Sequence, residues 1–213
     1  MMQASPGFER VLAEYRQRLA TEEALQASLT VKTDMAQHRD QLLLPVGEEV
    51  AELCVDLIVG RHAKIIVELG SSYGFSTLYL AEAARRTGGK LYSYEIHPDK
   101  QKHASERIAA AGLAGHVEWR LGDAVKLLAD QPGPIDFVLL DLWKDLYIPC
   151  LDAFHPKLAA NGVVLADNML YPEFSRPDGI VYRAAVRAKP DMEAVLLPIG
   201  QGIDLACRSR RGG

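Results

Sequence analysis

Two apolar segments of the chain, 137–140 and 163–166, end in side chains that carry oxygen ligands. Asp141 follows the first segment, and Asp167 and Asn168 follow the second. If both segments are parallel strands, their carboxyl ends lie at the edge of the sheet where ligands bind in open α/β folds. Two carboxylates and an amide, without His or Cys, are of the type that holds Mg²⁺ together with water and substrate oxygens. Each residue alone is more often a cap or turn residue, but together they favour a divalent-cation site.

A turn with two glycines lies earlier in the chain, after the apolar segment 65–69. Gly70 has no Cβ, so its backbone can approach a ligand, and Gly74 lets the start of the next helix pack against the strand. The amides of that helix start suit an anionic group, and Glu68 could accept hydrogen bonds from an ammonium group or its relays. The spacing lacks the third glycine of the dinucleotide fingerprint and the lysine of a P-loop. The glycines could also merely shape the turn.

Another acidic residue, Glu95, ends the next apolar segment, 91–94. An acidic residue at the tip of the second strand usually holds the hydroxyls of a ribose. Together with the glycine turn, Glu95 resembles the S-adenosylmethionine (SAM) site of class I methyltransferases.

The resemblance becomes more specific in two stretches, Asp-Leu-Trp-Lys-Asp-Leu-Tyr at 141–147 and Val-Leu-Ala-Asp-Asn at 164–168. With the Glu-Leu-Gly turn and Glu95, they resemble catechol O-methyltransferase and its bacterial and caffeoyl-CoA relatives, over roughly Gly47 to Asn168. This resemblance implies a SAM-dependent, divalent-cation-dependent O-methyltransferase that acts on a small aromatic acceptor with vicinal hydroxyl groups.

The resemblance also implies a role for individual residues. Mg²⁺, or another divalent cation such as Ca²⁺ or Mn²⁺, is expected on Asp141, Asp167 and Asn168. Lys144 is expected to be the base, with Asp141 as the second catalytic residue. The acceptor is expected to contact Lys144, Asn168 and Tyr171. SAM is expected to contact Glu68, Gly70, Ser71, Gly74, Ser76, Glu95, Ile96, Asp123, Ala124, Asp141 and Trp143.

This assignment is chemically consistent. A phenol has a pKa of about 10, which makes it a poor nucleophile at neutral pH, and a bound divalent cation lowers that pKa. A lysine amine is also normally protonated, but nearby positive charge and partial burial favour its neutral form. Lys144 could then take the phenol proton. Otherwise, Lys144 is a solvated loop lysine that pairs with Asp145.

The chain departs from the animal enzyme at two positions. A glutamate that accepts the second catechol hydroxyl has no match, because Val195 or its neighbours stand there and Glu193 is out of register. A tryptophan that walls the acceptor pocket has no match around 33–44. Three other functions stay open: a metal-independent SAM methyltransferase, a non-catalytic SAM-binding module, and a nicotinamide-dependent oxidoreductase, for which the glycine spacing is wrong.

The hydrophobic pattern predicts the elements that position these residues. It gives an amphipathic helix over 8–19 and another over 47–60, followed by alternating strands and helices. The strands are predicted at 64–69, 91–95, 116–120, 135–141, 162–167, 193–198 and 202–208, and the helices at 75–87, 98–112, 123–130, 146–159 and 179–189. This order predicts a Rossmann-like α/β fold: a mostly parallel seven-stranded sheet with an antiparallel edge strand and helices on both faces.

Length and composition predict a single domain over 1–213, and the resemblance implies that it is a SAM-dependent methyltransferase domain. Its expected parts are an N-terminal helical and cap segment (1–46), a core (47–208) and a tail (209–213). Within the first part, 33–41 could cap the acceptor pocket or serve as a connector. The amphipathic first helix, together with the resemblance to a family whose members form dimers, predicts a homodimer.

The charge and cysteine content point to a small-molecule partner. A net charge of −4 argues against a nucleic-acid surface. The sequence has no apolar run of membrane-spanning length, which argues against a membrane partner. Its three cysteines are widely spaced, which argues against a disulfide framework. A cytoplasmic location is therefore expected.

Overall fold

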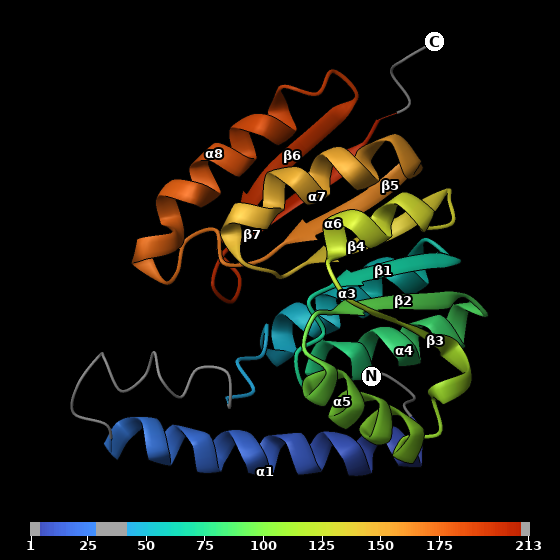
Figure 1. The fold of residues 1–213 in the computed structure, drawn as a ribbon, viewed down its shortest axis with the longest axis vertical. Helices are drawn as coiled ribbons and strands as arrows, with labels where there is room; N and C mark the ends of the chain where they lie inside the picture. The colour runs from blue at the N-terminus through green and yellow to red at the C-terminus, as the bar shows by residue number, and fades with distance from the viewer. Residues whose placement is uncertain (1–4, 29–41, 210–213) are drawn as a thin grey trace.

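The computed structural model describes residues 5–28 and 42–209 and is built around one seven-stranded sheet (Figure 1). The strand order is β3-β2-β1-β4-β5-β7-β6. The strands are β1 (Ile65–Leu69), β2 (Lys90–Glu95), β3 (Val117–Leu121), β4 (Ile135–Leu140), β5 (Leu158–Ala166), β6 (Met192–Leu197) and β7 (Ile203–Arg208). The α-helices are α1 (Pro6–Ser28), α3 (Glu48–Gly60), α4 (Phe75–Thr87), α5 (Pro98–Ala110), α6 (Ala124–Leu127), α7 (Tyr147–Phe154) and α8 (Arg176–Arg187).

The sheet confirms the predicted mixed topology. Strands β1 to β5 pair in parallel, whereas β7 pairs antiparallel with both β5 and β6. The predicted hairpin of the last two strands is therefore present. Its reversed strand, β7, lies one place in from the edge, and β6 forms the edge itself.

Several element boundaries differ from the prediction. Strand β5 begins at Leu158 because that residue already pairs with Ile135, ahead of an irregularity in the β4–β5 ladder. The helix predicted over 146–159 is shorter, since 3₁₀ turns flank α7 (η4, Lys144–Leu146, and η5, His155–Lys157). Pro156 in η5 has no backbone N–H to continue the α-helical bonding.

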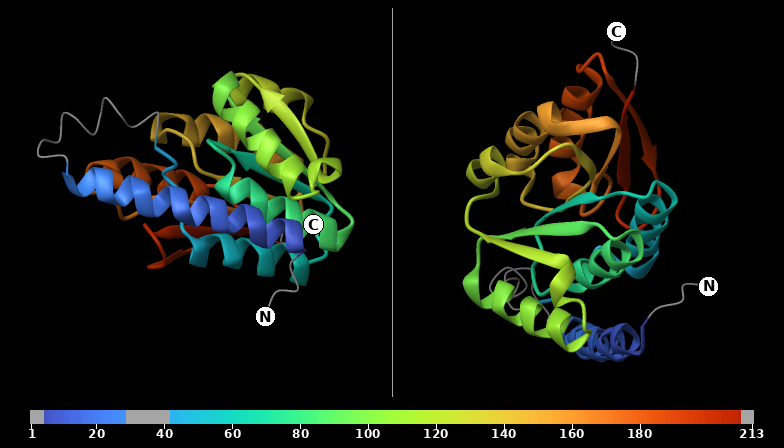
Figure 2. Two further views of the ribbon diagram at one scale, coloured as in Figure 1. Left: turned by 90° about the horizontal axis from the view of Figure 1, so that it is seen from below. Right: turned by 90° about the vertical axis from the view of Figure 1, so that its right-hand side faces the viewer.

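Helices cover both faces of the sheet, as the sequence predicts (Figures 1 and 2). One hydrophobic cluster joins α1, α3, α4 and α5 to side chains such as Ile66 and Phe137. The other joins α6, α7 and α8 to side chains such as Val67 and Val138. Because neighbouring residues of a strand point to opposite faces, both faces of the central strands are buried.

The first helix packs against the body of the domain. Its apolar stripe, formed by Phe8, Val11, Leu12 and Tyr15, is buried, and Figures 1 and 2 show α1 running alongside α5, with contacts to α4. The Arg16 guanidinium donates two hydrogen bonds of 2.7 Å to the carboxylate of Glu48 in α3. The helix reaches Ser28, beyond the predicted end.

The polar segment over 33–41 lies outside the described residues, so its predicted role as a cap stays a prediction. None of the described helices is long and apolar enough to cross a membrane.

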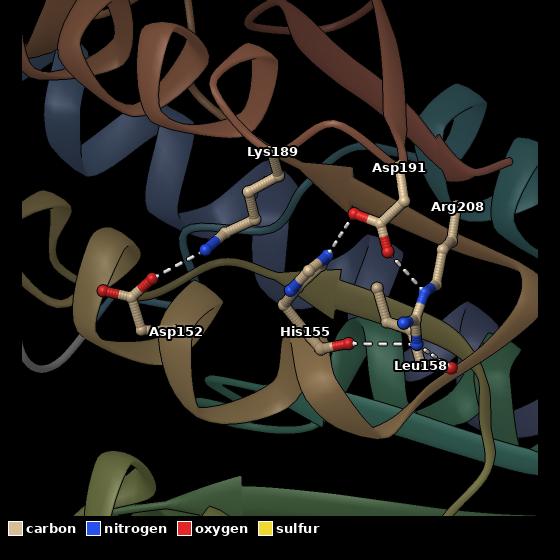
Figure 3. Close-up of polar contacts among 6 residues, drawn as sticks. All are labelled: Asp152, His155, Leu158, Lys189, Asp191 and Arg208. Atoms are coloured by element: carbon tan, nitrogen blue, oxygen red, sulfur yellow. Dashed lines mark hydrogen bonds and ion pairs between the residues drawn. The ribbon is translucent and has the colours of Figure 1, made fainter. Parts of the chain in front are cut away.

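A polar cluster fastens the last hairpin to the end of α7 (Figure 3). One oxygen of Asp191 bonds His155 Nε2 at 2.8 Å, and the other accepts from Arg208 Nε at 2.7 Å. Arg208 also donates to the carbonyl of Leu158 at 2.6 Å. Burial acts to raise the pKa of Asp191, but the hydrogen bonds from His155 and Arg208 outweigh it and hold the pKa below its ordinary value.

We expect Asp191→Asn to lower the free energy of unfolding by about 1–2 kcal/mol at pH 7, because the charge-assisted hydrogen bonds are weakened. A lowered carboxyl pKa stabilises the fold above the unfolded value of about 3.9, and this contribution is lost as the pH falls through the folded value. Urea unfolding at pH 7 and near pH 3 should therefore show a gap between wild type and variant that narrows in acid. Asp152→Asn is the control, because Asp152 is 64% exposed in its pair with Lys189 and its loss should cost little. A gap of the same size at both pH values would contradict this account.

Candidate active site

Backbone pairing brings the predicted acidic residues together. The Asp141 N–H donates to the carbonyl of Leu69 at the end of β1, at 3.0 Å. The Asp167 N–H donates to the carbonyl of Leu140 at the end of β4, at 3.1 Å. The ladders of three adjacent strands thus continue one residue beyond the strands themselves. Asp141 and Asp167 leave the sheet side by side at its carboxyl edge, where the sequence predicts a site.

The two carboxyl groups lie close to each other, with Asp167 buried and Asp141 half-buried. Asp167 is 1% exposed. Burial raises the pKa of Asp141, although the positive charge of Lys144 opposes that rise. Burial and then the negative charge of Asp141 raise the pKa of Asp167 well above its ordinary value. A divalent cation beside the two groups would favour their ionised forms.

Asp141, Asp167 and Asn168 offer oxygen ligands of the kind that a hard cation binds. Only two of the three, the aspartates, can carry a charge. Within 5–28 and 42–209, no three His, Cys, Asp or Glu side chains are grouped so that they could hold a metal ion. A cation on Asp141 and Asp167 would therefore depend on the Asn168 amide oxygen and on oxygens from water or an acceptor.

The amine of Lys144 lies against the corner formed by Asp167 and Asn168. Its Nζ donates to the carbonyl of Asp167 at 2.8 Å and to Oδ1 of Asn168 at 3.2 Å, and it contacts the hydroxyl of Tyr147. These contacts turn the side chain toward the acidic pair. They favour the predicted base position over that of a solvent-facing loop lysine.

The orientation of Asn168 depends on a residue that the sequence did not single out. Asn168 has a positive φ of 58°, and its N–H donates to Oδ1 of Asp167 at 2.6 Å. Its Nδ2 donates to Oε1 of Gln201 at 3.0 Å. The Gln201 carbonyl also accepts the N–H groups of Leu170 and Tyr171, both at 3.0 Å. The β6–β7 turn therefore supports the loop that follows β5.

The glycine turn packs more tightly against protein than the sequence implied. A Cβ on Gly70, whose φ is +98°, would lie 2.2 Å from the carbonyl oxygen of Asp141. Gly70 is therefore needed for the close approach of the Asp141 backbone. A Cβ on Gly74 would meet Ala104 of α5 at 2.8 Å and the Tyr15 hydroxyl of α1 at 2.9 Å. These contacts with two helices are a further reason for glycine at this position, and the sequence analysis did not predict them.

Glu68 lies beneath the turn and is fully buried. One oxygen accepts from the Ser76 hydroxyl at 2.6 Å, and the other accepts from Thr77 at 2.7 Å and Ser93 at 2.6 Å. Burial raises the pKa of Glu68 to about 7, while the three hydroxyl donors act in the opposite direction. Glu68 was predicted to accept hydrogen bonds either from an ammonium group or from side chains between the two, and these contacts favour the second. Thr77 and Ser93 also donate to Glu68, and the sequence analysis missed them.

Glu95 organises the backbone around the turn. Its carboxylate accepts the N–H groups of Ile96 and His97 at 2.9 Å and of Ser72 at 2.8 Å. Beside it, the Ser71 hydroxyl is buried without a hydrogen-bond partner among the described residues. An unpaired buried hydroxyl at this turn is available to a ligand.

The other predicted contact residues line the same edge of the sheet. Asp123 caps α6 by accepting the Val125 N–H at 3.0 Å, and the neighbouring Ala124 is buried. Three apolar or aromatic side chains are at least half exposed and could contact a ligand: Ile96, Trp143 and Tyr171.

We expect Gly70→Ala to destabilise the fold more than Gly112→Ala does. Both glycines have positive φ, +98° and +77°, so alanine is strained at each site, by about 1–3 kcal/mol. A Cβ on Gly112 meets nothing within 4 Å, whereas one on Gly70 collides with the Asp141 carbonyl. The difference in the free energy of unfolding, measured in urea, isolates the collision. Equal losses in the two variants would show that the Asp141 backbone moves away freely.

Comparisons with known proteins agree with this geometry. A family model described as a methyltransferase domain matches residues 67–169. An O-methyltransferase of Aspergillus thermomutatus is 28% identical, over 73% of this chain and 75% of that protein. The catechol O-methyltransferase of Bos taurus is 26% identical over 73% of this chain, which spans only 58% of the cattle protein.

A solved structure shows the same fold. The O-methyltransferase TomG from Streptomyces achromogenes, solved in complex with SAM, superposes with a TM-score of 0.72 at 26% identity. The superposition covers 89% of this chain and 96% of TomG. The chain therefore carries a methyltransferase domain match over 67–169 and is similar in sequence and fold to class I O-methyltransferases, catechol and caffeoyl-CoA O-methyltransferases among them.

Proposed function

We propose that the chain transfers a methyl group from SAM to a hydroxyl of a small aromatic acceptor with vicinal hydroxyl groups, with the help of a divalent cation. The observation that carries this proposal is the position of the Lys144 amine. It bonds the Asp167 carbonyl and the Asn168 amide oxygen, beside Asp141, and Asp141 in turn touches the glycine turn at Gly70. A proton acceptor and two carboxylates therefore adjoin the expected position of the methyl donor.

The residues of the glycine turn fit SAM. The buried Ser71 hydroxyl is unpaired among the described residues, and Glu95 and Asp123 contribute carboxylates at the tips of the next two strands. Ile96, Ala124 and Trp143 would contact the flat part of the molecule. SAM supplies a methyl group on a positively charged sulfur. Glu68 holds the Ser76 hydroxyl in place from below.

The acidic pair and Asn168 would hold the cation, Mg²⁺ or a similar ion. Such an ion stabilises the negative charge that develops on an acceptor oxygen. Asp141 and Asp167 fit this role because they lie close enough that the negative charge of Asp141 raises the pKa of the buried Asp167. The Asn168 amide is fixed for it by Gln201.

The chain's own residues move the proton and align the acceptor. In its neutral form, Lys144 Nζ accepts the proton of the acceptor hydroxyl. The ammonium that results is stabilised by the Asp167 carbonyl and by Oδ1 of Asn168. Tyr171 is exposed beside this corner and would flank the aromatic ring of the acceptor. Holding the two reacting atoms in line is the main contribution of the protein.

A metal-independent SAM methyltransferase is the second candidate. In that case the acidic pair, Asp141 and Asp167, would orient the acceptor without a cation. The homodimer and the cytoplasmic location stay predictions, and light scattering of the purified protein measures the first.

We expect methylation of a panel of catechol, caffeoyl and flavonoid acceptors to depend on Mg²⁺ and to stop in EDTA. Lys144→Ala and Asp141→Ala should each lower kcat/KM by at least about 100-fold, because they remove the base or a cation ligand. Calorimetry should show SAM affinity largely unchanged in Lys144→Ala, since Lys144 is not among the expected SAM contacts.

Lys189→Ala is the matched control, because Lys189 pairs with Asp152 and is drawn beside the polar cluster that fastens the last hairpin (Figure 3). Turnover that persists in EDTA would favour the metal-independent candidate. A Lys144→Ala variant that works like wild type would reject the assigned base. SAM binding without turnover of any acceptor would favour a non-catalytic module.

A further inference from the structure

Tyr147 is a buried polar residue in contact with the proposed base. It is the first residue of α7 and is fully buried. Its hydroxyl contacts Nζ of Lys144 and donates to the carbonyl of Asp167 at 3.2 Å. The same carbonyl accepts from Lys144 Nζ at 2.8 Å. The amine and the phenol therefore share one acceptor and touch each other.

The ring of Tyr147 also supports the amine from the side. Lys144 Nζ lies 3.8 Å from the centroid of this ring, a distance at which an ammonium is attracted by the aromatic face. The two residues are three positions apart across the junction of η4 and α7, so helical geometry puts them on the same side. Tyr182 of α8 packs against the ring edge-on, at 5.3 Å between centroids and 83° between planes. The ring is thus fixed from behind.

The hydroxyl of Tyr147 is placed to donate one hydrogen bond and accept another. Because its proton is directed to the Asp167 carbonyl, an oxygen lone pair faces the Lys144 amine. Tyr147 can therefore accept a hydrogen bond from Lys144.

We propose that Tyr147 is a positioning residue that holds the flexible Lys144 side chain in one orientation, with its amine at the Asp167–Asn168 corner. The proposal rests on the proposed function, in which Lys144 is the base. A lysine has four rotatable bonds, and a small displacement of a catalytic group lowers the rate steeply. The hydroxyl and ring of Tyr147 restrict this motion from two directions.

The first test measures the orientation of the Lys144 side chain and does not depend on methyl transfer. Lysines carrying ¹³C at Cε are introduced into the full chain, and the Lys144 signal is assigned by its loss in Lys144→Arg. In the wild type, we expect two distinct Cε proton shifts, displaced by the tyrosine ring. In Tyr147→Phe the ring remains but the hydroxyl is gone, and the two shifts should merge toward those of the exposed lysines.

The second test measures kinetics with a matched control. Tyr147→Phe should lower kcat about 10-fold while leaving KM for SAM and for the acceptor within about twofold, because binding is retained and alignment is lost. Tyr182→Phe is the control, since the Tyr182 hydroxyl is equally buried but has no hydrogen-bond partner among the described residues. It should leave kcat and the Lys144 signal unchanged.

The outcomes separate this inference from the proposed function. A Tyr147→Phe variant with an unchanged Lys144 signal, or with wild-type kcat, overturns the positioning role while Lys144→Ala can still be inactive. A Lys144→Ala variant that keeps wild-type turnover overturns both. Equal losses of kcat in Tyr147→Phe and Tyr182→Phe would show that only packing was disturbed and would also reject the positioning role.

Discussion

Two backbone hydrogen bonds hold the candidate site in place, those from the N–H groups of Asp141 and Asp167 to the carbonyls of Leu69 and Leu140. They extend the parallel ladders past the last strand residues and fix the direction in which both acidic side chains leave the sheet. In a strand, a shift of one residue turns every side chain to the other face. The apolar register that buries both faces of β1 and β4 therefore also determines the chemistry at their ends.

The site places ionisable groups where desolvation makes their charged forms unfavourable. Asp167 at the rim and Glu68 below it are buried, Asp141 is half-buried, and desolvation raises the pKa of all three. A fold selected for stability alone would replace them with apolar residues. Their retention is intelligible if a positively charged methyl donor and a cation bind there, since each would offset part of the buried negative charge.

The sequence predicts local and periodic features well. Apolar runs and glycine turns gave the order of the strands along the chain, and the rule for parallel strands joined Asp141 to Asp167. It could not predict contacts between distant segments. Gln201 lies in a hairpin turn with no local sign that it reaches Asn168. The contacts of Gly74 with Ala104 and Tyr15 were missed because only the packed helices show that these residues lie beside it.

The place of β7 in the sheet has a consequence for synthesis. This strand is hydrogen-bonded on both sides, between β5 and β6. While a growing chain emerges from the ribosome, β5 therefore keeps an open edge until residues up to Arg208 are available. That edge carries Val163, Val164 and Leu165, the sort of apolar strand that other chains can pair with. The nascent protein is most prone to aggregate during this interval, and a chaperone that shields β5 would act in the same period.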